Sequence, residues 1–216
     1  MTDIGRSRIV NALTFIRAPL IFMWAVFAVL HETSAAASRP ANLLLAVGAC
    51  AAMLLSGLTD LWDGWLARRW NVVSTLGKMS DPLMDKVFFI VAFPVLMWQA
   101  MHQDPGGAHG FALLLFTVLY VLRDTWVTFM RSVGTMYGAD VAAMWLGKVR
   151  TALSFPGAGW IYLYLAFHSE APERLRGIWL GSCYAVEAML VILTVWSIFT
   201  YTFAYLPYMK KAMTHR

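Results

Sequence analysis

The amino-acid sequence predicts an all-α polytopic membrane protein with six transmembrane helices and an amphipathic interfacial helix at its N-terminus. Two observations carry this prediction. First, 60% of the 216 residues are hydrophobic, which exceeds the apolar share of a soluble domain. Second, about 20 mostly apolar residues cross a bilayer, and the chain offers segments near that length. These candidate spans are residues 15–30, 41–59, 83–99, 111–129, 142–167 and 178–205.

The first span is short, and residues 1–14 before it can lie along the membrane interface. Their apolar and basic side chains separate as on an amphipathic helix: Ile4, Ile9, Val10 and Leu13 against Arg6 and Arg8. This apolar run has no small-residue cleavage site, so we expect an anchor and not a cleaved signal peptide. We find no linker, repeat or low-complexity segment, and we expect residues 1–216 to form one membrane domain.

Charge predicts the orientation of the chain. An even number of spans places both termini on one side, together with residues 60–86 and 130–150. Of 17 Lys and Arg residues, only Arg39, Arg174 and Arg176 fall on the other side. Since cytoplasmic loops are rich in Lys and Arg, we expect both termini and the functional face to be cytoplasmic. The net charge of +5 lies beside the spans, where it suits anionic lipid and phosphorylated substrates and not nucleic acid.

Proline, glycine and cysteine residues within the apolar segments give two further indications about the fold. Pro156 with Gly157 and Gly159 inside the fifth span predicts a kink or a close helix contact. Cys50 and Cys183 both lie within apolar blocks, so no disulfide framework is indicated and the redox compartment stays open.

The stretch from Asp60 to Asp85 holds the polar residues that predict a function. Residues three, four, seven and eight apart share one face of a helix. Two stripes result: Asp60, Asp63, Gly64, Ala67 and Arg68 on one, and Asp81 and Asp85 on the other. The chain between the stripes contains Asn71 and Gly77 and is long enough to turn back. The two stripes can therefore face each other.

Four carboxylates that converge in a low dielectric repel one another, and one or two bound divalent cations would keep them ionised. The stretch has no His or Cys, so hard oxygen ligands favour Mg²⁺, Mn²⁺ or Ca²⁺ over zinc. The alternative is that the aspartates cap helices or pair with neighbouring cations, namely Arg68, Arg69, Lys78 and Lys86. Their regular spacing beside membrane-length apolar runs favours the metal site.

The same residues resemble, without a gap, the D-x2-D-G-x2-A-R-x8-G-x3-D-x3-D pattern of the CDP-alcohol phosphotransferases. This resemblance implies a CDP-diacylglycerol donor and two divalent cations, Mg²⁺ or Mn²⁺, held by Asp60, Asp63, Asp81 and Asp85. It also implies Asp85 as the general base that deprotonates the acceptor hydroxyl. The donor would contact Asp60, Gly64, Ala67, Arg68 and Gly77, with the small residues leaving room for the nucleotide and Arg68 reaching the diphosphate.

A second group of cations stands at the ends of the fourth and fifth predicted spans: Arg123, Arg131, Lys148 and Arg150. A charge within an apolar run, as at Arg123, costs roughly 2.5–3.5 kcal/mol and needs a partner. Arg123 and Arg131 can point into one cavity, and guanidinium and ammonium groups suit a phosphate. We therefore expect a phosphate pocket. Asp124 can instead neutralise a neighbour, and interfacial anchoring is the alternative for Arg150.

Flanking motifs resemble those of bacterial phosphatidylglycerophosphate synthases: Asn11-x-Leu13-Thr14-x2-Arg17, Asp81-Pro82-x2-Asp85-Lys86, Arg123-Asp-x6-Arg131 and Ala143-Met-Trp-Leu-Gly147-Lys148-Val-Arg150-Thr151. The chain departs from that pattern at Val10, Asp124 and Ser154, where Pro, Glu and Gln are usual. The resemblance implies sn-glycerol 3-phosphate as the acceptor, whose phosphate would meet the basic pocket. It also implies a homodimer in the bacterial inner membrane.

Other functions remain open at this point. Another acceptor, such as inositol phosphate or phosphatidylglycerol, would want the same basic residues. A cation transporter would need acidic residues in several spans and symmetric halves; here the four aspartates sit at one edge, and Glu187 is the only acid deep in another span. A purely structural membrane protein would leave the aspartates unexplained.

Overall fold

A computed structural model describes residues 3–34, 39–72, 74–139 and 145–214, which are almost entirely helical and contain no strand. The all-α prediction is therefore confirmed for the described part of the chain. Its helices are α1 (Asp3–Thr33), α2 (Arg39–Trp70), α3 (Thr75–Gln103), α4 (Ala108–Met136), α5 (Trp145–Phe167), the short 3₁₀ helix η1 (His168–Glu170) and α6 (Glu173–Thr214). Five of these described helices, α1 to α4 and α6, are long and apolar enough to cross a membrane.

The helices run past the predicted spans because backbone hydrogen bonding continues after the apolar stretch ends. At the N-terminus, residues 3–33 form one unbroken helix with Pro19 inside it, so the structure does not divide an interfacial segment from the first span at residue 14. α5 is not among the five apolar helices; Lys148, Arg150 and Pro156 interrupt its apolar run. Residues 142–144 of the predicted fifth span lie outside the described residues.

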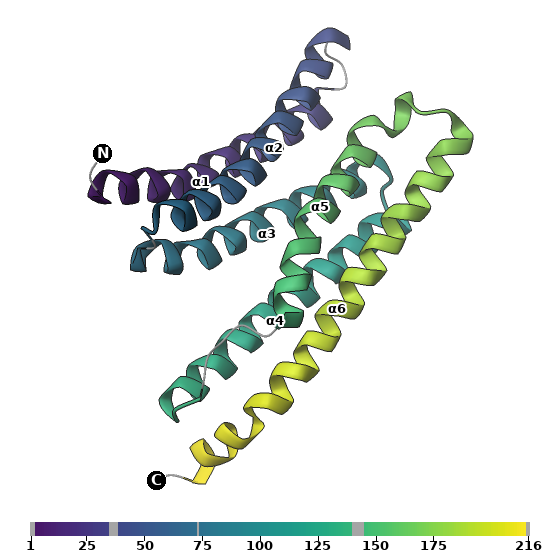
Figure 1. Ribbon diagram of the computed structural model, residues 1–216. Helices are drawn as coiled ribbons and strands as arrows, with labels where there is room; N and C mark the ends of the chain where they lie inside the picture. Colours follow the sequence, from purple (N-terminus) through teal and green to yellow (C-terminus); the bar gives the residue numbers. More distant parts are fainter. Residues whose placement is uncertain (1–2, 35–38, 73, 140–144, 215–216) are drawn as a thin grey trace.

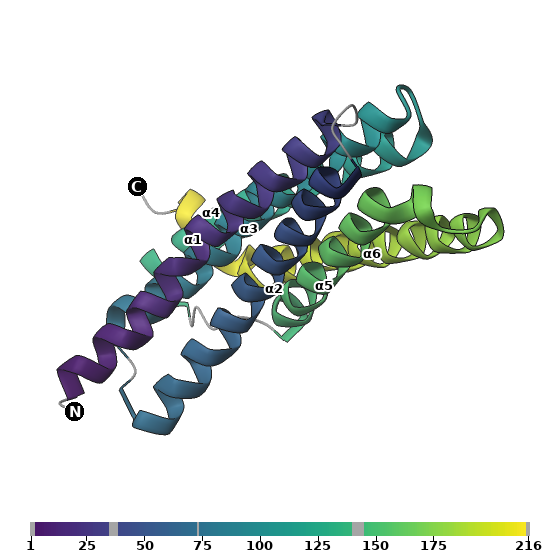
Figure 2. The same cartoon turned by 90° about the horizontal axis from the view of Figure 1, so that it is seen from above.

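Two helix pairs build the bundle, with α3 between them. α1 packs along α2 and α4 along α6 (Figures 1 and 2), while α3 touches α1, α4 and α5. Aromatic side chains fill the middle; Trp24, Phe93, Phe116 and Tyr162 are at most 1% exposed. Both termini and the α2–α3 turn lie at one end of the helices, and the α1–α2 and α5–α6 connections at the other (Figure 1).

The turn between α2 and α3 determines how the two aspartate-bearing segments meet. Asn71 has a left-handed backbone (φ 54°), which asparagine tolerates. Backbone bonds from Val72 N to Ala67 O and from Asn71 N to Arg68 O close the helix end as a Schellman motif. Ser74 then caps α3 by accepting a hydrogen bond from Gly77 N at 2.9 Å. The chain thereby reverses within a few residues, as the spacing predicted.

Glycines in α5 allow neighbouring helices to approach it closely. An added Cβ would lie 3.0 Å from Val186 at Gly157 and 3.7 Å from Met53 at Gly159. α5 therefore lies tightly against α6 and α2 at these points, and the predicted close helix contact is confirmed.

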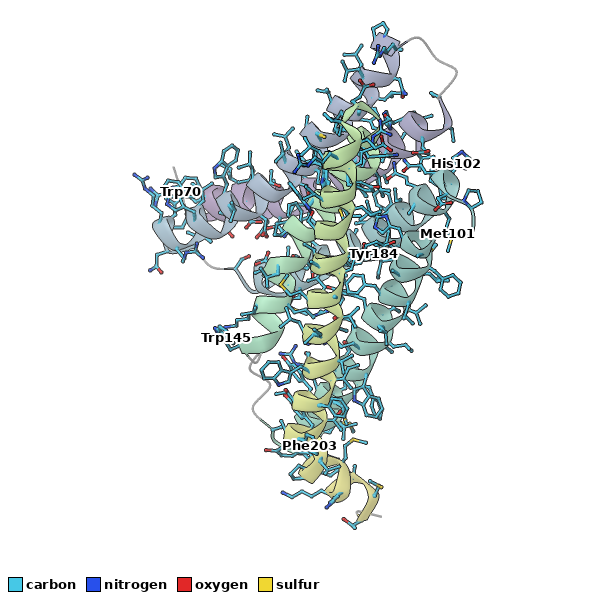
Figure 3. All side chains as sticks on the ribbon, turned by 90° about the vertical axis from the view of Figure 1, so that its right-hand side faces the viewer. Trp70, Met101, His102, Trp145, Tyr184 and Phe203 are labelled. Atoms are coloured by element: carbon cyan, nitrogen blue, oxygen red, sulfur yellow. The ribbon has the colours of Figure 1, made fainter. Side chains whose placement is uncertain are left out.

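The end of the bundle away from the α2–α3 turn contains a buried polar pair of its own. Glu187 Oε1 lies 2.7 Å from His109 Nε2, so the one acid deep in α6 has a structural partner. Figure 3 separates the two ends of the bundle: Trp70 and Trp145 lie on one side, and Met101 and His102 on the other.

Candidate active site

The four aspartates occupy the facing ends of α2 and α3. Asp60 and Asp63 lie in the last three turns of α2, and Asp81 and Asp85 in the first three turns of α3. Asp63 is 4% exposed, whereas the side chains of Asp60 and Asp85 are 45% and 37% exposed. Asp81 is exposed. The group therefore has a buried floor and an open side that a substrate can reach.

Arg17 of α1 lies between the two aspartate-bearing helices. Its Nη1 is 2.7 Å from Asp60 Oδ1, and its Nη2 is 2.9 Å from Asp85 Oδ1. The Arg17 side chain is only 4% exposed. A single buried guanidinium thus links one carboxylate of α2 to one of α3.

Thr14, one turn before Arg17, holds the most buried carboxylate. Its hydroxyl donates a 2.8 Å hydrogen bond to Asp63 Oδ2. Sequence reasoning found Thr14 and Arg17 only as members of a flanking motif and gave neither a partner. α1 therefore contributes to the site together with α2 and α3, which carry the aspartates.

The donor set suits a hard divalent cation, because every candidate ligand is a carboxylate oxygen. A cationic group is already shared by Asp60 and Asp85, which shows that these carboxylates converge on positive charge. Within the described ranges, however, no three acidic, His or Cys side chains stand close enough to form a ready metal centre. Arg17 contacts Asp60 and Asp85, whereas Asp63 accepts its hydrogen bond from Thr14.

The predicted donor-binding residues lie on the same ends of the two helices. Arg68 folds back over Gly64, since an added Cβ there would lie 3.4 Å from its Nη1. Ala67 is half-buried in the last turns of α2. Gly77 lies where α3 meets α1; an added Cβ would be 3.1 Å from Ser74 Oγ and 3.4 Å from Asn11 Oδ1. The absence of a side chain at Gly64 leaves room for the guanidinium of Arg68 against α2.

The structure brings Arg123 and Arg150 together around Asp124. Arg123 Nη1 and Arg150 Nη2 lie 3.6 Å and 4.0 Å from the same oxygen, Asp124 Oδ1. Lys86 Nζ lies 3.1 Å from the other oxygen, Oδ2. Three cations around one carboxylate leave an excess of positive charge. The sequence indicates Lys86 as a partner of the aspartates and as a member of a flanking motif, and not as a member of this basic group.

Arg150 has unused hydrogen-bonding capacity in this cluster. It is 3% exposed, and its Nε and Nη1 are buried without a hydrogen-bond partner among the described residues. Its guanidinium stacks on the Tyr120 ring at 4.1 Å. Buried donors without partners are costly, and an anionic ligand with several oxygens would satisfy them.

α6 fixes the other arginine, which sequence reasoning did not foresee. Arg123 donates to Ser197 Oγ from Nε at 3.0 Å and from Nη2 at 2.5 Å, and it lies 5.2 Å from the Tyr201 ring centroid. Ser197 and Tyr201 are buried. Neither carried a sequence signal, because each is one polar residue in a long apolar helix.

Arg131 and Lys148, the other predicted phosphate ligands, are more exposed than Arg123 and Arg150. Arg131 is eight residues beyond Arg123 on α4, about 12 Å along the helix axis, and is half-buried. Lys148 is exposed in the first turn of α5. Ala143 and Met144 of the predicted motif, and the side chain of Lys78, lie outside the described residues.

The two clusters adjoin through α3. Asp85 of the carboxylate group and Lys86 of the basic group are consecutive residues, so the acidic and basic clusters share one helix turn. A substrate with a metal-binding diphosphate and a second substrate with a phosphate could therefore lie side by side.

Known proteins resemble this chain over most of its length. The family model described as CDP-alcohol phosphatidyltransferase matches residues 8–204. The CDP-diacylglycerol–glycerol-3-phosphate 3-phosphatidyltransferase of Sodalis glossinidius is 29% identical over 160 residues, which cover 72% of this chain and 78% of that protein. The enzyme of the same name from Escherichia coli K12 is 28% identical over 149 residues, or 68% and 72% of the two chains.

Proposed function

Since the chain belongs to the CDP-alcohol phosphatidyltransferase family, we propose that it transfers a phosphatidyl group from CDP-diacylglycerol to sn-glycerol 3-phosphate. The products would be phosphatidylglycerophosphate and CMP. The relatives' names support this donor and acceptor. The observation that carries the proposal is that an acidic and a basic cluster lie next to each other on α3. The consecutive residues Asp85 and Lys86 belong to one cluster each.

The donor would bind over the ends of α2 and α3. The small side chains of Gly64 and Ala67 would let the nucleotide approach the α2 backbone. The guanidinium of Arg68, which lies over Gly64, would turn to pair with a phosphate. Gly77 would complete this surface. Asp60, Asp63, Asp81 and Asp85 would hold one or two Mg²⁺ or Mn²⁺ ions. When bound, such ions neutralise the diphosphate and stabilise the charge that develops on CMP as it leaves.

Asp85 would act as the general base. The acceptor oxygen attacks the phosphorus that carries the diacylglycerol, the bond from this phosphorus to the CMP oxygen breaks, and the acceptor proton passes to Asp85. Arg17 contacts Asp85 through Oδ1, which leaves Oδ2 to receive the proton. The position of Asp85 next to Lys86 places the base beside the basic cluster that would hold the acceptor.

The acceptor phosphate would bind between Arg123 and Arg150. Their guanidiniums flank one oxygen of Asp124, and the buried Arg150 nitrogens without partners would donate to phosphate oxygens. Lys86 adds a third positive charge. Arg131 and Lys148 remain proposed members of this site, and each would meet the phosphate or its approach path.

We further propose that α5 crosses the membrane as the sixth span and that the first turns of α1 lie in the interface. The chain would form one domain in the bacterial inner membrane, with both termini and the site on the cytoplasmic side. The excess of Lys and Arg on that side supports this orientation. A homodimer is expected from the family resemblance, and the mass of the purified protein in a native membrane mimetic tests it.

A direct assay tests the proposed reaction. Purified protein with CDP-diacylglycerol and Mg²⁺ is expected to release CMP when sn-glycerol 3-phosphate is supplied, and much less with glycerol, which lacks the phosphate. Inositol phosphate and phosphatidylglycerol serve as the alternative acceptors. EDTA should abolish CMP release, and added Mg²⁺ or Mn²⁺ should restore it, because the carboxylates would otherwise face the diphosphate without a cation.

Two outcomes would contradict the proposal. Full activity in EDTA would remove the metal from the reaction. A clear preference for another acceptor would retain the phosphatidyl transfer but replace glycerol 3-phosphate.

Gly64→Ala is expected to yield a stable protein with weaker affinity for CDP-diacylglycerol. The new Cβ would meet only the flexible end of Arg68, at 3.4 Å, and alanine favours the helix by roughly 0.5–1 kcal/mol. It would nevertheless occupy the space proposed for the nucleotide. Thermal unfolding and the dependence of the rate on donor concentration measure the two effects separately.

Gly181→Ala is the matched control, since a Cβ at this position of α6 meets nothing within 4 Å. It should gain the same helix stability and keep normal donor affinity. Unchanged donor affinity in a stable Gly64→Ala protein would show that the nucleotide does not approach α2 at this point.

A further inference from the structure

Arg17 lies among the proposed metal ligands and contacts two of them. It comes from α1, yet its two terminal nitrogens contact a carboxylate of α2 and one of α3, at 2.7 Å and 2.9 Å. Both partners, Asp60 and Asp85, are proposed metal ligands. The Arg17 side chain is 4% exposed, so it is built into the site and does not merely lie at its rim.

We propose that Arg17 competes with the divalent cation for Asp60 and Asp85. The proposal rests on the metal site described under the proposed function. A carboxylate oxygen that accepts a charge-assisted hydrogen bond from Arg17 uses one of its lone pairs in that bond. A divalent ion next to the same oxygen would also meet the positive charge of the guanidinium.

The four carboxylates differ in the partners that surround them in the structure. Asp63 has its own partner in Thr14, and Asp81 is exposed to solvent. Asp60 and Asp85 each give one oxygen to Arg17, so a cation that binds those two oxygens has to displace the guanidinium.

The test measures cation binding and not turnover. Arg17→Gln is purified in Mn²⁺ and stripped of it, and Mn²⁺ affinity is then measured by electron paramagnetic resonance or calorimetry, without substrate. We expect the affinity to rise about tenfold or more, the scale of one lost charge-assisted contact. Without Mn²⁺, the variant should also unfold at a lower temperature than the wild type. Added Mn²⁺ should raise the unfolding temperature of the variant by more than it raises that of the wild type.

Two further variants separate a local contact from a general change of charge. Arg69→Gln removes the same charge from the end of α2, where Arg69 lies over the Trp65 ring, and it should leave Mn²⁺ affinity nearly unchanged. Arg17→Lys keeps the charge but lacks the planar fork that reaches both carboxylates. The Mn²⁺ affinity of Arg17→Lys should lie between those of the wild type and Arg17→Gln. Arg17→Lys also replaces Arg17→Gln in the test if the glutamine variant does not fold.

Equal or weaker Mn²⁺ affinity in the Arg17 variants, in a protein whose wild type binds Mn²⁺, would overturn the competition and leave the proposed function intact. An equal rise in Arg69→Gln would also overturn it, since the effect would then be one of overall charge. If the wild type and both Arg17 variants bind no Mn²⁺, the metal site of the proposed function fails as well.

Discussion

Asp85→Asn is expected to slow turnover by about 10²–10⁴-fold, the usual contribution of a general base. Asparagine keeps the shape of aspartate, and its side-chain oxygen can still accept the bond from Arg17 that Asp85 Oδ1 accepts at 2.9 Å. The variant should therefore fold. It cannot take the acceptor proton, and it binds a cation less well. The rate of CMP release at saturating concentrations of both substrates and Mg²⁺ measures the loss.

Asp60→Asn is the matched control for this experiment. Asp60 is the other partner of Arg17 and the other half-exposed carboxylate, but it is not the proposed base. Its replacement should weaken donor and metal binding, with much of the turnover regained at high Mg²⁺. Near wild-type turnover in Asp85→Asn would mean that another group accepts the proton.

Replacing Arg123 or Arg150 by glutamine is expected to lower kcat/KM for glycerol 3-phosphate by about 10- to 100-fold. One charge-assisted contact is worth about 1.5–3 kcal/mol, and about 1.4 kcal/mol corresponds to a factor of ten. The donor's KM should hardly change, because its diphosphate is bound at the carboxylate cluster. Varying each substrate separately at a fixed concentration of the other gives both values.

α6 provides a sharper version of this test. Ser197→Ala removes the hydroxyl that holds Arg123 without changing any charge, and it should raise the acceptor's KM. Thr194→Val, one turn away, removes a buried hydroxyl that bonds only to Leu190 O of its own helix, and it should not. Equal losses for donor and acceptor in the arginine variants would remove Arg123 and Arg150 from the acceptor site and give them a structural role.

The parts of the site that could be predicted from sequence are those that depend on local geometry. The spacing of Asp60 with Asp63, and of Asp81 with Asp85, determines shared helix faces because the helical period is fixed. The reversal at Asn71 follows from a residue that tolerates a left-handed backbone. The described helices extend beyond the predicted spans, since hydropathy marks the apolar stretch and not the last hydrogen-bonded turn.

The parts that could not be predicted depend on which helix faces meet. Thr14 and Asp63 are 49 residues apart, and Arg17 and Asp85 are 68 apart. Ser197 reaches Arg123 across 74 residues. Spacing within one helix contains no information about these pairings. For the same reason the spacing does not show that Lys86 shares Asp124 with Arg123 and Arg150.

The link that Arg17 makes between α2 and α3 has a consequence for biosynthesis. All the contacts described for the carboxylate cluster join residues of the first three helices, up to Asp85. Because α1 to α3 precede the other helices in the chain, these contacts need no residue of α4 to α6. Arg17 is made before its partners Asp60 and Asp85 and can pair with each as it follows.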